Sequence, residues 1–155
     1  MRALFATAGI ALVAVVAAVV FLWPVQRSGP EPIDFGRDAC AHCRMHISQA
    51  GFGGELRDTR GTLTKYDDIG CLLRAMVAMH REVPEAWVED HAGAGFTPLL
   101  AATLVRANDI ETPMGSRIVA FADESAAATF VQKQGGQVVA LEDLLRSSNA
   151  KEMEK

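Results

Sequence analysis

The sequence predicts an α+β fold in which two homologous ββαβ units follow one another in tandem, preceded by one N-terminal transmembrane helix. Three observations predict this class. Residues 1–23 contain a long uncharged run from Ala3 to Trp23, patterns of strands and helices alternate within residues 38–92, and the same order returns within residues 96–146. Half of the 155 residues are hydrophobic, which excludes a disordered chain.

The uncharged run predicts a transmembrane signal anchor over residues 1–23. It is long enough, at about 1.5 Å per helical residue, to cross a bilayer core. It also exceeds the apolar stretch of a secretory signal and ends in Phe21-Leu22-Trp23-Pro24, although a cleaved signal stays the alternative. Arg2 and an acidic remainder favour a cytoplasmic start, which places the body of a single-pass inner-membrane protein in the periplasm. The net charge of −4 and the absence of a basic cluster exclude nucleic acid as a partner.

The rest of the chain divides into three parts. Residues 24–37 are rich in proline and predict a flexible tether. Residues 38–146 form the predicted domain, with halves at about 38–92 and 96–146 and a short final helix from Leu141 to Arg146. Residues 147–155 predict a frayed polar tail.

The first half is predicted to contain two strands, a helix and a third strand. The segments 53–57 and 63–66 flank a turn at 58–61, whose aspartate and glycine suit a hairpin. Asp68 is a predicted N-cap, because apolar residues recur at helical spacing after it until Pro84. The segment 86–90 predicts the third strand, and a glycine-rich stretch at 92–96 separates the halves.

The second half repeats this order. Strands are predicted at 101–106 and 116–122 around a Pro-Met-Gly turn, followed by a helix that ends at Gly135-Gly136 and a strand at 137–141. Asp123 or Ser125 is the predicted cap of this helix. A shift of 55 residues superimposes Tyr66 to Leu72 on Phe121 to Ala127, so that the aromatic residue, the cap and the helix phase coincide. This agreement indicates an internal duplication.

The highest concentration of sulfur and imidazole side chains lies in Cys40-Ala41-His42-Cys43-Arg44-Met45-His46. Cys40 and Cys43 have the spacing of residues that approach one another in a turn, and Met45 shares a face with Cys43 if the chain leaves the turn extended. Thiolate and thioether are soft donors that select Cu(I). These residues therefore predict a Cu(I) site.

Three other interpretations of the cysteine pair compete with a copper site. A closed zinc site needs four ligands, and beyond this motif the chain offers only a lone Cys71 and the scattered His80 and His91. A thioredoxin-like site needs the pair at the start of a helix, whereas here Met45-His46-Ile47 follows with strand character. A structural disulfide between Cys40 and Cys43 stays an alternative, because oxidising compartments favour it.

The remaining sulfur and imidazole groups give weaker signals. Cys71 lies in the first turn of an apolar helix and is expected to pack in the core, as are Met76 and Met79. Met114 lies at a turn, outside any apolar periodicity, and is expected to be exposed. His42 and His46 are interpreted as loop histidines that can support a metal.

The motifs together resemble the NosL family of copper-binding accessory proteins of nitrous oxide reductase. The resemblance rests on Cys40-Ala41-His42-Cys43-Arg44-Met45, Tyr66 to Cys71, Pro113-Met114-Gly115-Ser116, and Phe121-Ala122-Asp123 through Gly136. The family usually has glycine at the position of Arg44, and usually a lipidated cysteine after its signal, which this sequence lacks.

The resemblance implies a periplasmic, membrane-anchored Cu(I) metallochaperone and not an enzyme. It implicates Cys43, Met45 and Met114 as metal ligands, with Cys40 as an additional thiol, so that both halves line one site. The implied partner is a copper enzyme or its assembly machinery, with the nitrous oxide reductase maturation system as the expected recipient. A thiol-disulfide oxidoreductase that uses Cys40 and Cys43 is the alternative function.

Overall fold

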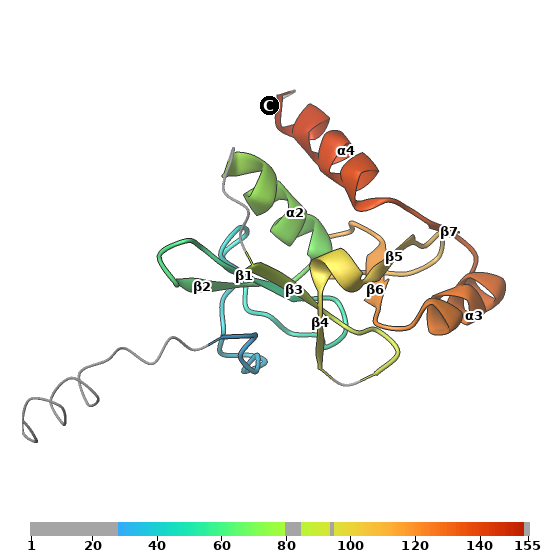
Figure 1. The fold of residues 1–155 in the computed structure, drawn as a ribbon, viewed down its shortest axis with the longest axis horizontal. Coiled ribbons are helices and arrows are strands. Elements are labelled where there is room, and N and C mark those ends of the chain that lie inside the picture. Colours follow the sequence, from blue (N-terminus) through green and yellow to red (C-terminus); the bar gives the residue numbers. More distant parts are fainter. Residues whose placement is uncertain (1–27, 80–84, 94, 154–155) are drawn as a thin grey trace, which may run out of the picture.

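The computed structural model describes residues 28–79, 85–93 and 95–153, and they form a mixed α+β fold with antiparallel sheets (Figure 1). This class is the predicted one. The order of the elements is β1, β2, α2, β3, β4, η1, β5, β6, α3, β7 and α4. The predicted transmembrane segment, residues 1–23, lies outside the described residues, and none of the described helices is long and apolar enough to cross a membrane.

The first sheet has the strand order β2-β1-β3-β4. Its strands are β1 (Gly54–Arg57), β2 (Leu63–Tyr66), β3 (Glu85–Glu89) and β4 (Phe96–Pro98). The hairpin between β1 and β2 turns as predicted, because the Asp58 carboxylate accepts the backbone N–H groups of Arg60 and Thr62 at 3.0 and 2.8 Å. Strand β4 was not predicted: the stretch expected to separate the halves instead ends in a strand that pairs with β3.

The second sheet has the order β6-β5-β7 and follows the short helix η1 (Leu99–Ala101). Its strands are β5 (Thr103–Arg106), β6 (Ile118–Phe121) and β7 (Gln137–Val138), with α3 (Glu124–Gln134) between β6 and β7. Asp123 is the N-cap of α3 and accepts the backbone N–H of Ser125, and Gly135 ends the helix with φ 73°. These caps are the predicted ones.

The second sheet separates two hydrophobic cores. Successive side chains of a strand point to opposite faces. Leu104 therefore packs into the main core with the first sheet and α2 (Ile69–Ala78), whereas Val105 packs into a smaller core beneath α3. The alternation continues on β6, where Ile118 and Ala120 belong to the main core. Because the main core takes residues from both halves, the halves fold as one hydrophobic unit.

The C-terminal helix α4 (Leu141–Met153) returns to the first half and packs against α2 (Figure 1). Leu144 is fully buried in the main core, which anchors the helix there. The helix continues to Met153, seven residues beyond the predicted end at Arg146. The predicted frayed tail is therefore helical as far as Met153.

The described part of the predicted tether, residues 28–37, lies against the first sheet. The Glu31 N–H donates to the Glu55 carboxylate at 2.8 Å, Arg57 donates to the Gly29 carbonyl at 2.8 Å, and Lys65 Nζ donates to the Pro32 carbonyl at 2.7 Å. Ile33 is buried in the main core. This part of the chain is therefore fixed to the domain, and the flexible tether predicted for residues 24–37 does not include it.

Candidate metal centre

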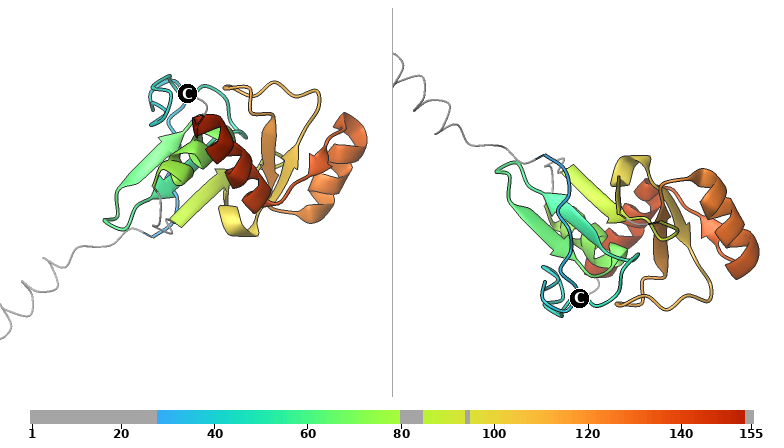
Figure 2. Two further views of the ribbon diagram at one scale, coloured as in Figure 1. Left: turned by 90° about the horizontal axis from the view of Figure 1, so that it is seen from above. Right: turned by 90° about the horizontal axis from the view of Figure 1, so that it is seen from below.

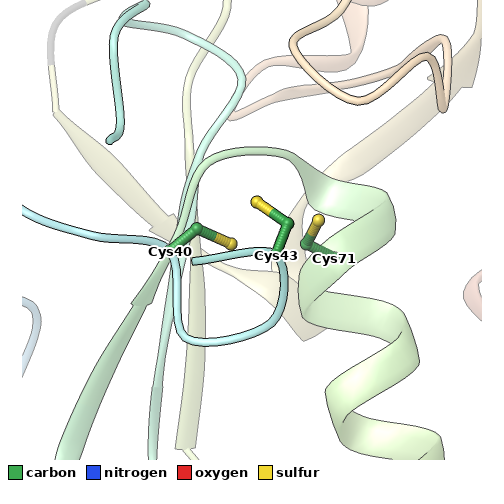
Figure 3. Close-up of side chains that lie close together, drawn as sticks. All are labelled: Cys40, Cys43 and Cys71. Carbon is green, nitrogen blue, oxygen red and sulfur yellow. The ribbon is translucent and has the colours of Figure 1, made fainter. Parts of the chain in front are cut away.

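Three cysteine thiols meet at one end of helix α2. The Sγ atoms of Cys40, Cys43 and Cys71 all lie within 4.8 Å of one another, and all three thiols are free (Figure 3). Cys40 and Cys71 are fully buried, whereas Cys43 is half-buried. Within the described part of the chain, this cluster has the ligand types and spacing of a metal site.

Backbone hydrogen bonds shape the loop that carries the first two cysteines. The Cys40 N–H donates to the Met45 carbonyl at 2.8 Å, and the Arg44 N–H donates to the Cys40 carbonyl at 2.9 Å. Ala39 and His46 pair as an antiparallel bridge at the neck of the loop. The Ala41 N–H then donates to the Lys65 carbonyl on β2, which fixes the loop to the sheet. The two cysteines are held in place by the backbone.

Arg44 has a left-handed backbone conformation, with φ 67°. A residue with a Cβ is strained there, and glycine is not. The loop is therefore formed with arginine in a conformation that favours glycine.

Replacing Arg44 with glycine is expected to stabilise the protein. The left-handed conformation costs an ordinary residue about 1–2 kcal/mol, and glycine loses about 0.5–1 kcal/mol of this gain to the greater entropy of the unfolded chain. The free energy of unfolding should therefore rise by about 0.5–1 kcal/mol in a denaturant titration. An unchanged or lower value would show that the arginine side chain compensates for the strain.

Cys71 reaches the cluster because helix α2 begins beside it. Asp68 is the N-cap, and its Oδ1 accepts the Gly70 N–H at 2.6 Å. The Cys71 N–H donates to the Asp68 carbonyl at 2.9 Å, so the thiol lies in the first turn. The sequence predicted this cap and a buried cysteine, and both predictions are confirmed.

The same aspartate joins the second half of the chain to this turn. Asp68 Oδ2 accepts the Thr112 hydroxyl at 2.7 Å and the Met114 N–H at 3.0 Å. A Cβ at Gly70 would lie 2.6 Å from Ser116 Cβ, so glycine is needed for this close approach. The turn with Met114 therefore lies against the end of α2 that carries Cys71.

The three thiols differ in their pKa values. The pKa of Cys40 is lowered to about 4, because the Cys71 thiol and the backbone N–H groups of Cys43, Asp67 and His42 donate to its sulfur, although burial opposes this. The pKa of Cys71 is raised, because it donates to Cys40 and because it is buried. Burial likewise raises the pKa of Cys43. The cluster thus favours a single thiolate, on Cys40.

The other predicted ligands lie around the cluster at different depths. Met45 is 55% exposed. Met114 is half-buried and packs against the main core, as Cys43 does, and was expected to be exposed. His42 and His46 are exposed. The structure brings the two predicted cysteines together and places the Met114 turn beside them.

Sequence reasoning missed the role of Cys71 in the cluster. It was assigned to the core, and it does lie there, fully buried. Its sulfur also lies beside those of Cys40 and Cys43, which are about 30 positions away in the sequence. Only the packing of the loop against α2 produces this contact, and the sole signal in the sequence is its place just after the Asp68 cap.

The fold and the site together define a small α+β domain with a compact centre of three thiols. The chain belongs to the NosL family, whose model matches residues 32–148. The family is not one of enzymes, which agrees with the prediction.

A solved structure supports the fold. It is described as the crystal structure of the copper chaperone NosL from Shewanella denitrificans, and it has a TM-score of 0.65 and 19% sequence identity. The match covers 75% of this chain and 95% of that one. The comparison with curated proteins gives no match.

Proposed function

We propose that this protein is a Cu(I) metallochaperone, which binds one copper ion and passes it on by ligand exchange. The observation that carries this proposal is the cluster of three thiols within 4.8 Å, in a chain of the NosL family. Thiolates are soft ligands that favour Cu(I) over harder cations. The similar solved protein is described as a copper chaperone, which supports the same cargo.

Two kinds of sulfur take part in the proposed site. Cys40 and Cys43 are the ligands predicted from the sequence, and Cys71 joins them by geometry. Met45 and Met114 are the proposed thioether ligands, from the loop and from the turn held by Asp68. A neutral thioether binds Cu(I) without adding charge. It leaves the ion easier to release than a further thiolate would.

Metal selectivity tests this proposal. The reduced full-length chain in a neutral detergent, titrated anaerobically against competing chelators, should retain about one Cu(I) per chain and release Zn(II) to a modest chelator, following donor softness. Zinc retained tightly with a four-coordinate spectrum, or no Cu(I) retained, would contradict the copper assignment.

We further propose that residues 1–23 hold the protein in the inner membrane, with its domain in the periplasm. The proposed recipient of the copper is a copper enzyme, with nitrous oxide reductase as the first candidate. The uncharged run from Ala3 to Trp23 supports the anchor. The mature protein should begin at or near Met1 and remain with the membrane fraction, with a domain that protease reaches from the periplasmic side. Amino-terminal sequencing that begins near Pro24 in a soluble fraction would identify a cleaved signal instead.

The two halves are proposed to be homologous ββαβ units. Their elements follow the same order, as β1-β2-α2-β3 and as β5-β6-α3-β7, and the first strand lies between the other two in each. Asp68 and Asp123, which are 55 positions apart, are both N-caps. A duplication accounts for this correspondence most simply.

The alternative function, a thiol-disulfide oxidoreductase, has one feature in its favour: the lowered pKa of Cys40. A reactive thiolate must, however, also be accessible to its substrate. Cys40 is fully buried, and the C-x-x-C pair lies in a loop, not at the start of a helix. The geometry therefore favours metal binding over disulfide exchange.

A further inference from the structure

Two arginines adopt a backbone conformation that strongly favours glycine. Among the described residues, Arg44 with φ 67° and Arg117 with φ 59° are the non-glycine residues with positive φ. A strained backbone persists where the surrounding structure imposes it, and such residues cluster at functional sites. Both strained positions carry the same side chain.

Both arginines lie in loops at the border of the thiol centre. Arg44 stands between Cys43 and Met45. Arg117 follows Ser116, whose Cβ lies 2.6 Å from the position of a Cβ on Gly70, next to Cys71. The Arg117 N–H donates to the Thr112 hydroxyl at 3.2 Å, in the network that ends on Asp68. The arginines thus flank the site from the two halves.

Their charges are free to meet a partner. Both residues are exposed, and neither guanidinium group makes a hydrogen bond or an ion pair within the part of the chain that the structure describes. Arg37, Arg60 and Arg146, in contrast, pair with aspartates. Arg106 and Lys133 are likewise exposed without an ion pair among the described residues, so it is their place in the loops beside the thiol centre that distinguishes Arg44 and Arg117.

The burial of the thiols gives the metal one side from which to leave. Cys40 and Cys71 are fully buried, whereas Cys43 is half-buried and Met45, two residues further along the loop, is exposed. A recipient must therefore approach over the loop of Arg44. Ligand exchange also requires the recipient to offer soft donors of its own.

We propose that Arg44 and Arg117 form a docking surface for an acidic partner protein that presents thioether or imidazole donors. This inference rests on the proposed copper transfer and adds the charge of the recipient to it. Complementary charge steers the encounter and raises the association rate more than the affinity. Binding of the partner would then explain why arginine stands at two positions where its backbone conformation lowers the stability of the fold.

The test compares two synthetic peptides that share one Met-x-x-Met donor sequence, flanked by aspartates in one peptide and by lysines in the other. Cu(I) transfer from the loaded full-length chain in a neutral detergent is followed by stopped flow. At low salt, the aspartate peptide should remove copper roughly tenfold faster than the lysine peptide, and the ratio should approach one at high salt. Because the readout is a ratio of rates to two peptides, a change in copper affinity does not affect it.

The variants Arg44→Glu and Arg117→Glu should each lower this ratio or invert it. The larger effect is expected at Arg44, since the exposed Glu111 lies in the same loop as Arg117. Lys133→Glu is the matched control: it makes the same change of charge at an exposed position in the last turn of α3 and should leave the ratio unchanged. Helix α3 lies on the opposite side of the second sheet from α2 (Figure 2).

The glycine variants separate docking from structure. Arg44→Gly and Arg117→Gly relieve the backbone strain, so they should unfold at a higher temperature and yet show a ratio nearer to one. Equal rates for the two peptides in the parent protein, or a ratio that Lys133→Glu lowers as much as Arg44→Glu does, would overturn the docking surface. A chain that binds no Cu(I) at all would instead contradict the proposed function.

Discussion

Cys43→Ser is expected to weaken Cu(I) retention by more than about 100-fold. Loss of a group that only hydrogen-bonds to a metal ligand already costs about 10- to 100-fold in metal affinity, and loss of the ligand itself should cost more. The substitution removes a soft donor that is half-buried and lies within 4.8 Å of the two other thiols. Serine is a hard donor of similar shape, so the loop should keep its fold. A competition titration with a Cu(I) chelator measures the loss.

Two methionine substitutions show whether the second half contributes to the site. Met114→Leu replaces the thioether with a side chain of nearly the same volume, and should reduce copper retention while the fold is kept. Met76→Leu is the matched control, because Met76 also packs, half-buried, against the main core but lies on α2 beyond the thiols. Should both variants bind copper like the parent, the site would consist of the cysteines and Met45, and the contribution of the second half would be wrong.

Cys71→Ala addresses the ligand that only the structure identifies. Alanine keeps a small apolar side chain in the core but removes the sulfur and its hydrogen bond to Cys40, so a loss of copper affinity much larger than the loss of stability would assign Cys71 to the site. The parent affinity in this variant would limit Cys71 to packing.

Asp68→Ala is expected to lower the free energy of unfolding by about 3–5 kcal/mol. Loss of an N-cap costs about 0.5–2 kcal/mol, and each buried donor left without a partner costs about 1–3 kcal/mol. Asp68 is fully buried and accepts three donors: the Gly70 N–H, the Thr112 hydroxyl and the Met114 N–H. Chemical denaturation followed by circular dichroism gives the value.

Asp123→Ala is the control at the corresponding position of the second half. Asp123 also caps a helix, but it is exposed, and among the described residues its carboxylate accepts hydrogen bonds from Ser125 alone. Its replacement should cost about 1 kcal/mol. The difference between the two variants measures the connection that Asp68 makes between the halves, and equal costs would show that this connection adds no stability.

Local chemistry accounts for the part of this structure that the sequence determined by itself. Asp68 and Asp123 were predicted as caps because a short acidic side chain accepts N–H groups of its own helix, and Gly135 was predicted as an end because it tolerates positive φ. The Asp58 turn and the strands beside it follow from the same kind of short-range preference. The proximity of Cys40 and Cys43 also belongs here, since two intervening residues leave them few ways to separate.

Only the tertiary structure decided the features that depend on distant surfaces. Strand β4 forms because β3 offers it an edge, and α4 lies against α2 because Leu141, Leu144 and Leu145 pack into or against the main core. Cys71 joins the other thiols because the loop fixed to β2 packs against the start of α2, and Asp68 brings the Met114 turn to the same place. Such contacts depend on which surfaces remain to be buried once the local elements have formed, and a linear pattern of residues does not contain that information.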